Sequence, residues 1–167
     1  MGYNITIGEG VILTPNLDDA DECGYDLSVG ARGECRDDAP SFPGDSMTGK
    51  SNGRSPSYST WSDFCRDAGI YDLFYNKANG LMRKHPGTAF LAPKHGAAIA
   101  AALDKYRTKH PGAKPGWREQ TEGGNFFDGP WKPETEGLDG TLARLIWLDY
   151  WVQWALKNCT VPVIRNT

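Results

Sequence analysis

The chain has 167 residues, of which 39% are apolar and 23% charged, and its formal net charge is -3. A chain of this length is expected to form a single domain, residues 1–167, around one core. The negative charge disfavours long nucleic acid as a partner because the chain has no global positive field. Residues 1–13 contain no positively charged leader, and no window approaches the ~18–20 apolar residues of a membrane span, so we expect a cytoplasmic protein without a membrane partner.

The N-terminal part of the chain predicts a small antiparallel sheet. Apolar and polar residues alternate over 3–7, and an apolar run at 11–13 follows Gly8-Glu9-Gly10, which predicts a hairpin with its turn at 8–10. Residues 25–29 alternate in the same way and predict a third strand. The acidic run at 18–22 lacks the Gly and distal Glu of a calcium loop, so we interpret it as a solvated connection.

Residues 34–57 form a long segment without periodicity, rich in Gly, Ser, Pro, Asn and Asp. Long irregular loops inside a compact domain are often functional. Residues 44–51 (GDSMTGKS) match the phosphate-binding pattern G-x-x-x-x-G-K-S, which requires a strand before it and a helix after it. Neither flank has the pattern of these elements, so we expect no hydrolysis of nucleoside triphosphates.

Two helices are predicted in the middle of the chain. The first begins at Ser59 or Thr60, where Thr60 and Asp63 have capping-box spacing, and ends at Gly69, which suits a left-handed stop. Pro93 can open the second, which reaches residue 109. A short helical turn, an extended segment and a long loop are expected at 70–74, 89–91 and 111–137.

The last predicted helix, residues 140–159, is apolar on most of its circumference and should be the central buried element. The expected fold is therefore α+β, with a small N-terminal antiparallel sheet packed on a buried C-terminal helix, two or three further helices and long loops. Helical spacing directs Arg144 toward the core. Its partner is either a carboxylate from the early loops or an anionic ligand.

The histidines and cysteines predict no metal or redox site. His85 and His110 precede Pro-Gly and suit turns, while His95 shares an apolar helix face and suits a satisfied core position. No histidine spacing typical of a metal site occurs. The cysteines lack C-x-x-C spacing, so free thiols are expected, with a Cys23–Cys35 disulfide left open.

Residues 2–8, 55–74 and 143–159, about a quarter of the chain, resemble short uncharacterised proteins of bacterial and phage genomes. The resemblance carries no assigned activity. It implies a prokaryotic or viral setting and carries over no catalytic residue.

We interpret the long loop and the last helix as one ligand site. Guanidinium groups suit phosphate, hydroxyl and amide groups suit sugar or phosphate oxygens, and aromatic faces stack on bases. The sequence therefore predicts that residues 44–58 close over a small anionic, nucleotide-like ligand. The residues assigned to this site are Ser51, Asn52, Arg54, Ser55, Ser57, Tyr58, Trp61, Arg66, Arg144, Trp147 and Trp151.

Binding is favoured over catalysis because no general base is evident beside this site, and no cofactor, metal or catalytic residue is assigned. In a phage, such a protein would act in the host cytoplasm and sequester a host signalling nucleotide. Two other classes stay open, an enzyme acting on a nucleotide or phosphorylated substrate and a protein–protein interaction module. A homo-oligomer is compatible with each of them.

Overall fold

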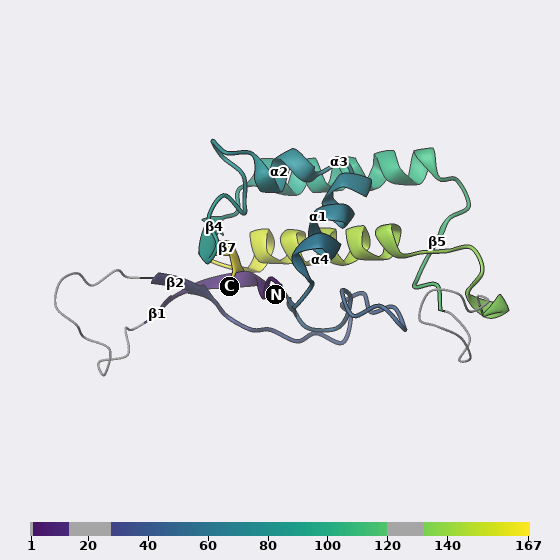
Figure 1. Ribbon diagram of the computed structural model, residues 1–167. Coiled ribbons are helices and arrows are strands. Elements are labelled where there is room, and N and C mark those ends of the chain that lie inside the picture. The colour runs from purple at the N-terminus through teal and green to yellow at the C-terminus, as the bar shows by residue number, and fades with distance from the viewer. Residues whose placement is uncertain (1, 14–27, 120–131) are drawn as a thin grey trace.

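The computed structural model describes residues 2–13, 28–119 and 132–167, and within these ranges the chain is an α+β protein, as predicted (Figure 1). A five-stranded sheet has the order β2-β1-β7-β4, with β3 paired to β1. A separate parallel pair joins β5 to β6. The strands are β1 (Ile5–Leu13), β2 (Ser28–Ala31), β3 (Gly53–Arg54), β4 (Gly87–Phe90), β5 (Lys114–Pro115), β6 (Leu138–Asp139) and β7 (Pro162–Asn166), and the helices are α1 (Tyr58–Asp67), α2 (Tyr71–Tyr75), α3 (Pro93–Lys109), the short 3-10 helix η2 (Pro133–Thr135) and α4 (Gly140–Asn158).

β1 is one continuous strand, so the predicted hairpin with a turn at residues 8–10 is wrong. Its first half pairs with β7 and its second half with β2. Gly8 allows neighbouring segments to approach β1 closely, because a Cβ atom at this position would lie 2.9 Å from the carbonyl oxygen of Arg32 and from Nδ2 of Asn52. The third predicted strand is present as β2 from Ser28 onward, whereas residues 18–22 and 25–27 lie outside the described residues.

The sequence analysis missed β7, which lies between β1 and β4 in the sheet. The strand is five residues long and opens with Pro162, which is tolerated at the first position of a strand. Its buried residues Val163 and Ile164 are adjacent, so period-two alternation is not visible. The N-terminal sheet is therefore completed by the C-terminal end of the chain.

The predicted helices are present, with one correction at the start of α1. The cap is Ser57, whose hydroxyl accepts a hydrogen bond from the amide of Thr60 at 3.1 Å, so the predicted capping box of Thr60 and Asp63 is wrong. Gly69 has a φ of +71° and forms the expected left-handed stop. The short turn at residues 70–74 is α2, and Pro93 opens α3 as predicted.

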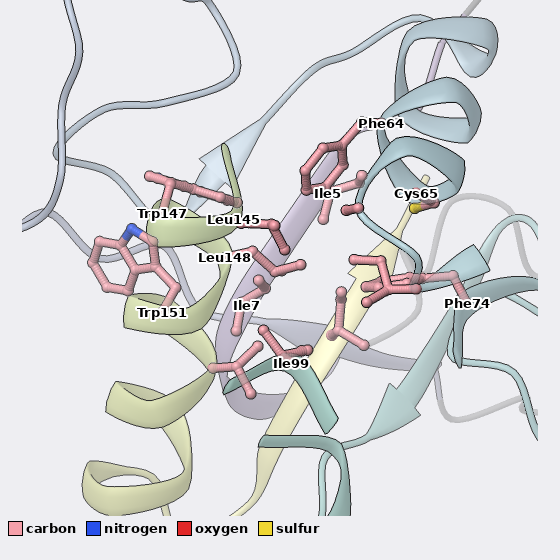
Figure 2. Close-up of a cluster of buried hydrophobic side chains, with 14 of the residues drawn as sticks. Ile5, Ile7, Phe64, Cys65, Phe74, Ile99, Leu145, Trp147, Leu148 and Trp151 are labelled. Atoms are coloured by element: carbon pink, nitrogen blue, oxygen red, sulfur yellow. The ribbon is translucent and has the colours of Figure 1, made fainter. Parts of the chain in front are cut away.

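α4 is the central buried element, as its apolar circumference predicted. It packs against β1 on one side and runs beside α3 on the other (Figure 1). Figure 2 shows Ile5 and Ile7 of β1 pointing toward Leu145 and Leu148 of α4. All four side chains are fully buried, so the sheet and the last helix share one apolar core.

Candidate functional site

Residues 34–57 are largely irregular but are anchored to β1 and α4. The side-chain amide of Asn52 donates to the carbonyl oxygens of Ile7 and Arg32, both at 2.8 Å, and its oxygen accepts from the amide of Glu34 at 2.8 Å. The indole of Trp147 donates to the carbonyl oxygen of Gly49 at 3.0 Å. Asn52 is buried and fully engaged by the backbone, so its amide is not presented to a ligand.

Arg144 points inward, as predicted, and its partner is a carboxylate of the early loop. Its guanidinium contacts Asp45 through Nε at 3.2 and 3.3 Å and through a terminal nitrogen at 3.1 Å. The Arg144 and Asp45 side chains are 11% and 1% exposed. The same guanidinium lies 4.4 Å from the ring centroid of Trp117. Of the two partners left open by the sequence, the structure shows the internal ion pair.

Arg54 lies beside this pair. Its guanidinium is 5.6 Å from the ring centroid of Trp147, and one terminal nitrogen is 3.4 Å from the hydroxyl of Ser51. Nε of Arg54 is buried without a hydrogen-bond partner among the described residues. Burial lowers the pKa of Arg54, and the nearby charge of Asp45 offsets part of that shift. The structure thus groups Arg54, Ser51 and Trp147 as the sequence analysis expected.

The three tryptophans assigned to the ligand site do not present a surface on which a base could stack. Trp61, Trp147 and Trp151 are each at most 1% exposed, because all three belong to the hydrophobic core. A base cannot stack on a ring whose faces are already packed. Helical spacing identified these residues as large and apolar but could not separate a ligand-facing ring from a core ring.

The other predicted site residues are separated from Arg144. Ser55 donates to the side-chain oxygen of Asn4 at 2.8 Å, and Ser57 caps α1. Arg66 pairs with Asp63 at 2.8 Å and lies over the ring of Tyr71. Tyr58 contacts His85 instead. These four residues therefore do not line one pocket with Arg144.

Residues 44–51 do not have the setting of a phosphate-binding loop. Turns and bends occupy the segment, and no strand directly precedes it and no helix directly follows it. Nζ of Lys50, the residue that would hold phosphate, lies 2.8 Å from the carboxylate of Asp37 at the protein surface. The match is one of sequence alone.

A groove that the sequence analysis missed lies between α3, α4 and residues 36–40. We call it the α3/α4 groove. Its volume is about 590 Å³, within the range of about 300–1,000 Å³ typical of small-molecule sites. Its main lining residues are Arg36, Asp38, Arg107, Tyr150, Trp154 and Lys157.

One wall of the α3/α4 groove is a network of polar side chains. Nε of Arg36 donates to the hydroxyl of Tyr150 and to the carboxylate of Asp38, both at 2.9 Å, and Tyr150 also donates to Asp38 at 2.9 Å. The hydrogen bond to Asp38 is the largest cause that raises the pKa of Arg36. Burial raises the pKa of Tyr150. The network holds the hydroxyl of Tyr150 and the guanidinium of Arg36 together at the groove edge.

Two further cations line the α3/α4 groove. Arg107 on α3 and Lys157 on α4 are exposed, and neither contacts a carboxylate within the described residues. Trp154 lies half-buried in the lining, edge to face with Trp151 at 5.4 Å. Helical spacing puts Asp149, Gln153 and Lys157 on one polar stripe of α4, but only the packing of α3 against α4 shows that this stripe and Arg107 line the same groove.

The histidine and cysteine side chains that the structure describes form neither a metal site nor a disulfide. His95 is buried and its Nδ1 accepts from the amide of Ala92 at 3.0 Å, as expected for a satisfied core histidine. No group of three His, Cys, Asp or Glu side chains in the described ranges could hold a metal ion. Cys35, Cys65 and Cys159 are free, and Cys23 lies outside the described residues. No described helix is both long and apolar enough to cross a membrane.

Comparison of the chain with protein-family models, with curated proteins and with solved structures gave no match.

Proposed function

We propose that the protein binds a small anionic, nucleotide-like ligand in the α3/α4 groove without turning it over. The observation that carries this proposal is that Arg107 and Lys157 line the groove together with Trp154 and have no carboxylate partner among the described residues. The ligand class is the one expected from the sequence. The proposed site differs from residues 44–58, because the cation of Arg144 is neutralised there by Asp45.

The charges of the groove favour an anion. Its lining holds three cations, Arg36, Arg107 and Lys157, against the carboxylates of Asp38 and Asp149, whereas the whole chain is net negative. Arg36 and Asp38 neutralise each other through their ion pair. Arg107 and Lys157 remain, against the single carboxylate of Asp149, to receive phosphate, which ammonium and guanidinium groups bind through charge-assisted hydrogen bonds.

The aromatic side chains supply a complementary apolar surface. Trp154 and Tyr150 lie along the groove, with the apolar side chains of Leu103 and Ile146 in the same lining. A flat base packs favourably on such a surface, and stacking contributes about 1–3 kcal/mol per base. The groove thus combines a base-sized apolar face with cations at its edge. In a phage, binding of this kind would sequester a host signalling nucleotide.

Calorimetric titration with linear and cyclic nucleotides tests the proposal. We expect binding by the wild-type protein that weakens as salt increases, and weaker binding of the corresponding nucleoside. Removing one cation–phosphate contact costs about 1.5–3 kcal/mol, so Arg107→Gln and Lys157→Gln should each raise Kd by roughly 10- to 100-fold.

Lys105→Gln is the matched control, because Lys105 is an exposed cation on α3 that does not line the groove. Its Kd should equal that of the wild type. Absence of binding by every nucleotide, or an equal loss in Lys105→Gln, would contradict the proposal. Release of nucleotide products during the titration would instead favour the enzyme alternative.

A further inference from the structure

A cluster of three rings lies outside the α3/α4 groove and shares no residue with it. Tyr3, Tyr58 and His85 come from distant parts of the chain and contact one another edge to face. The ring centroids of Tyr58 and His85 are 5.4 Å apart, and those of Tyr3 and Tyr58 are 4.6 Å apart. His85 is exposed and Tyr58 half-buried, so a solute has access to their polar atoms.

A chain of hydrogen bonds fixes the tautomer of His85. Its Nδ1 lies 2.8 Å from Oδ1 of Asn166, and its Nε2 lies 3.0 Å from the hydroxyl of Tyr58. Oδ1 can only accept, so Nδ1 carries the proton and Nε2 of the neutral ring carries the lone pair. The hydroxyl of Tyr58 therefore donates to Nε2. This is the arrangement of a hydroxyl nucleophile, a base and a residue that orients the base.

Asn166 is held firmly enough to orient the imidazole. It lies on β7, where it is paired with Ile5 of β1 on one side and with Gly87 of β4 on the other. It is 1% exposed, which leaves its side chain little freedom. The residue that orients the base thus belongs to the interior of the sheet, although His85 itself lies in an exposed irregular segment.

The chain around His85 attracts anions. Arg83 and Lys84 precede it and line a hollow of about 370 Å³ together with Gly87 and Thr88 of β4. None of the described lining residues is a carboxylate. The hollow does not include Tyr58 or His85 itself, but its two cations directly precede His85 in the chain and favour an electrophile that carries negative charge.

We infer that Tyr58 is a nucleophile toward a phosphate diester, with His85 as its general base and Asn166 as a positioning residue. The Tyr58 oxygen forms a bond to phosphorus while the bond from phosphorus to the leaving oxygen breaks. The phenolic proton passes to Nε2 of His85 and then to the leaving oxygen. Water, deprotonated by the same nitrogen, then attacks phosphorus and releases Tyr58, which recovers its proton from His85.

Incubation of the full chain with bis(p-nitrophenyl) phosphate tests this inference, with nitrophenolate release and intact-protein mass as readouts. We expect release above the protein-free rate and a covalent adduct that maps to Tyr58. General bases contribute about 100- to 10,000-fold, so His85→Gln should lower the rate at least 100-fold, and Tyr58→Phe should abolish the adduct.

Tyr3→Phe is the matched control, because the Tyr3 ring lies in the same cluster but its hydroxyl contacts Tyr75 rather than His85. It should retain the wild-type rate. Asn166→Asp keeps an acceptor opposite Nδ1 and favours the protonated imidazole, so the pH at which release rises should move upward. No release by the wild type, an unchanged rate in Tyr58→Phe, or an equal loss in Tyr3→Phe would overturn the inference.

Discussion

The buried ion pair of Arg144 and Asp45 predicts a large and specific loss of stability. Arg144→Met removes the cation and leaves the carboxylate of Asp45, which is 1% exposed, without its ion-pair partner. Breaking a buried pair in this way costs about 3–5 kcal/mol. For a domain of this size each kcal/mol lowers Tm by roughly 2–4 °C, so we expect a decrease of roughly 6–20 °C.

A double-mutant cycle measured by chemical and thermal unfolding isolates the pair. Asp45→Asn keeps an oxygen for the amide of Met47, which now donates to Asp45 at 3.0 Å, and leaves the guanidinium of Arg144 unpaired. The double variant leaves neither charge. It should therefore be more stable than the sum of the two single losses predicts, with a coupling energy of about 1–3 kcal/mol.

Additive losses, with a coupling energy below about 0.5 kcal/mol, would refute this reasoning. So would a Tm for Arg144→Met within about 2 °C of the wild type, because less than 1 kcal/mol would then depend on the pair. Either result would mean that Asp45 does not hold Arg144 in a stabilising ion pair, and Arg144 would then be available to bind a ligand.

Three further predictions concern the core, pH and the phosphate-loop match. Trp151→Ala and Leu148→Ala, both at fully buried positions of α4, should each cost roughly 2–5 kcal/mol in unfolding titrations, and wild-type stability in either would contradict the packing of this helix. Burial lowers the pKa of His95, so below its unfolded value of about 6.5 the unfolded chain binds more protons and stability falls with decreasing pH. His95→Asn keeps an acceptor for the amide of Ala92 and should flatten this slope between pH 5 and 7 in denaturation curves. The protein should not hydrolyse ATP or GTP with magnesium, and turnover that disappears in Lys50→Ala would contradict that expectation.

Local sequence signals located the helices well. The apolar circumference of residues 140–159 identified the central helix, and Pro93 and Gly69 marked a helix start and a helix end that the structure confirms. These signals work because caps and periodicity depend on neighbours in sequence. The strands were harder to predict. Glycine is common in turns, but Gly8 is required in the middle of β1 because Arg32 and Asn52 approach its backbone closely.

The candidate sites could be predicted only in part, because they depend on which elements meet. The inward direction of Arg144 followed from helical spacing, but the choice between Asp45 and a ligand required the path of the early loop. Tyr58 was singled out for its aromatic ring. Tyr58 is hydrogen-bonded to His85, and His85 to Asn166, so these contacts connect the start of α1 with β7. Contacts between such distant residues cannot be predicted from the local sequence.

Binding in the α3/α4 groove is tested most directly by following the indole N–H signals in ¹H–¹⁵N NMR spectra during titration with the tightest-binding nucleotide. The Trp154 signal should shift in proportion to saturation, because its ring lines the groove. The signals of Trp61 and Trp147, which are buried elsewhere in the core, should stay in place. A shift at Trp147 without one at Trp154 would place the ligand beside Arg54 and residues 44–58, and the absence of any shift would contradict binding in the groove.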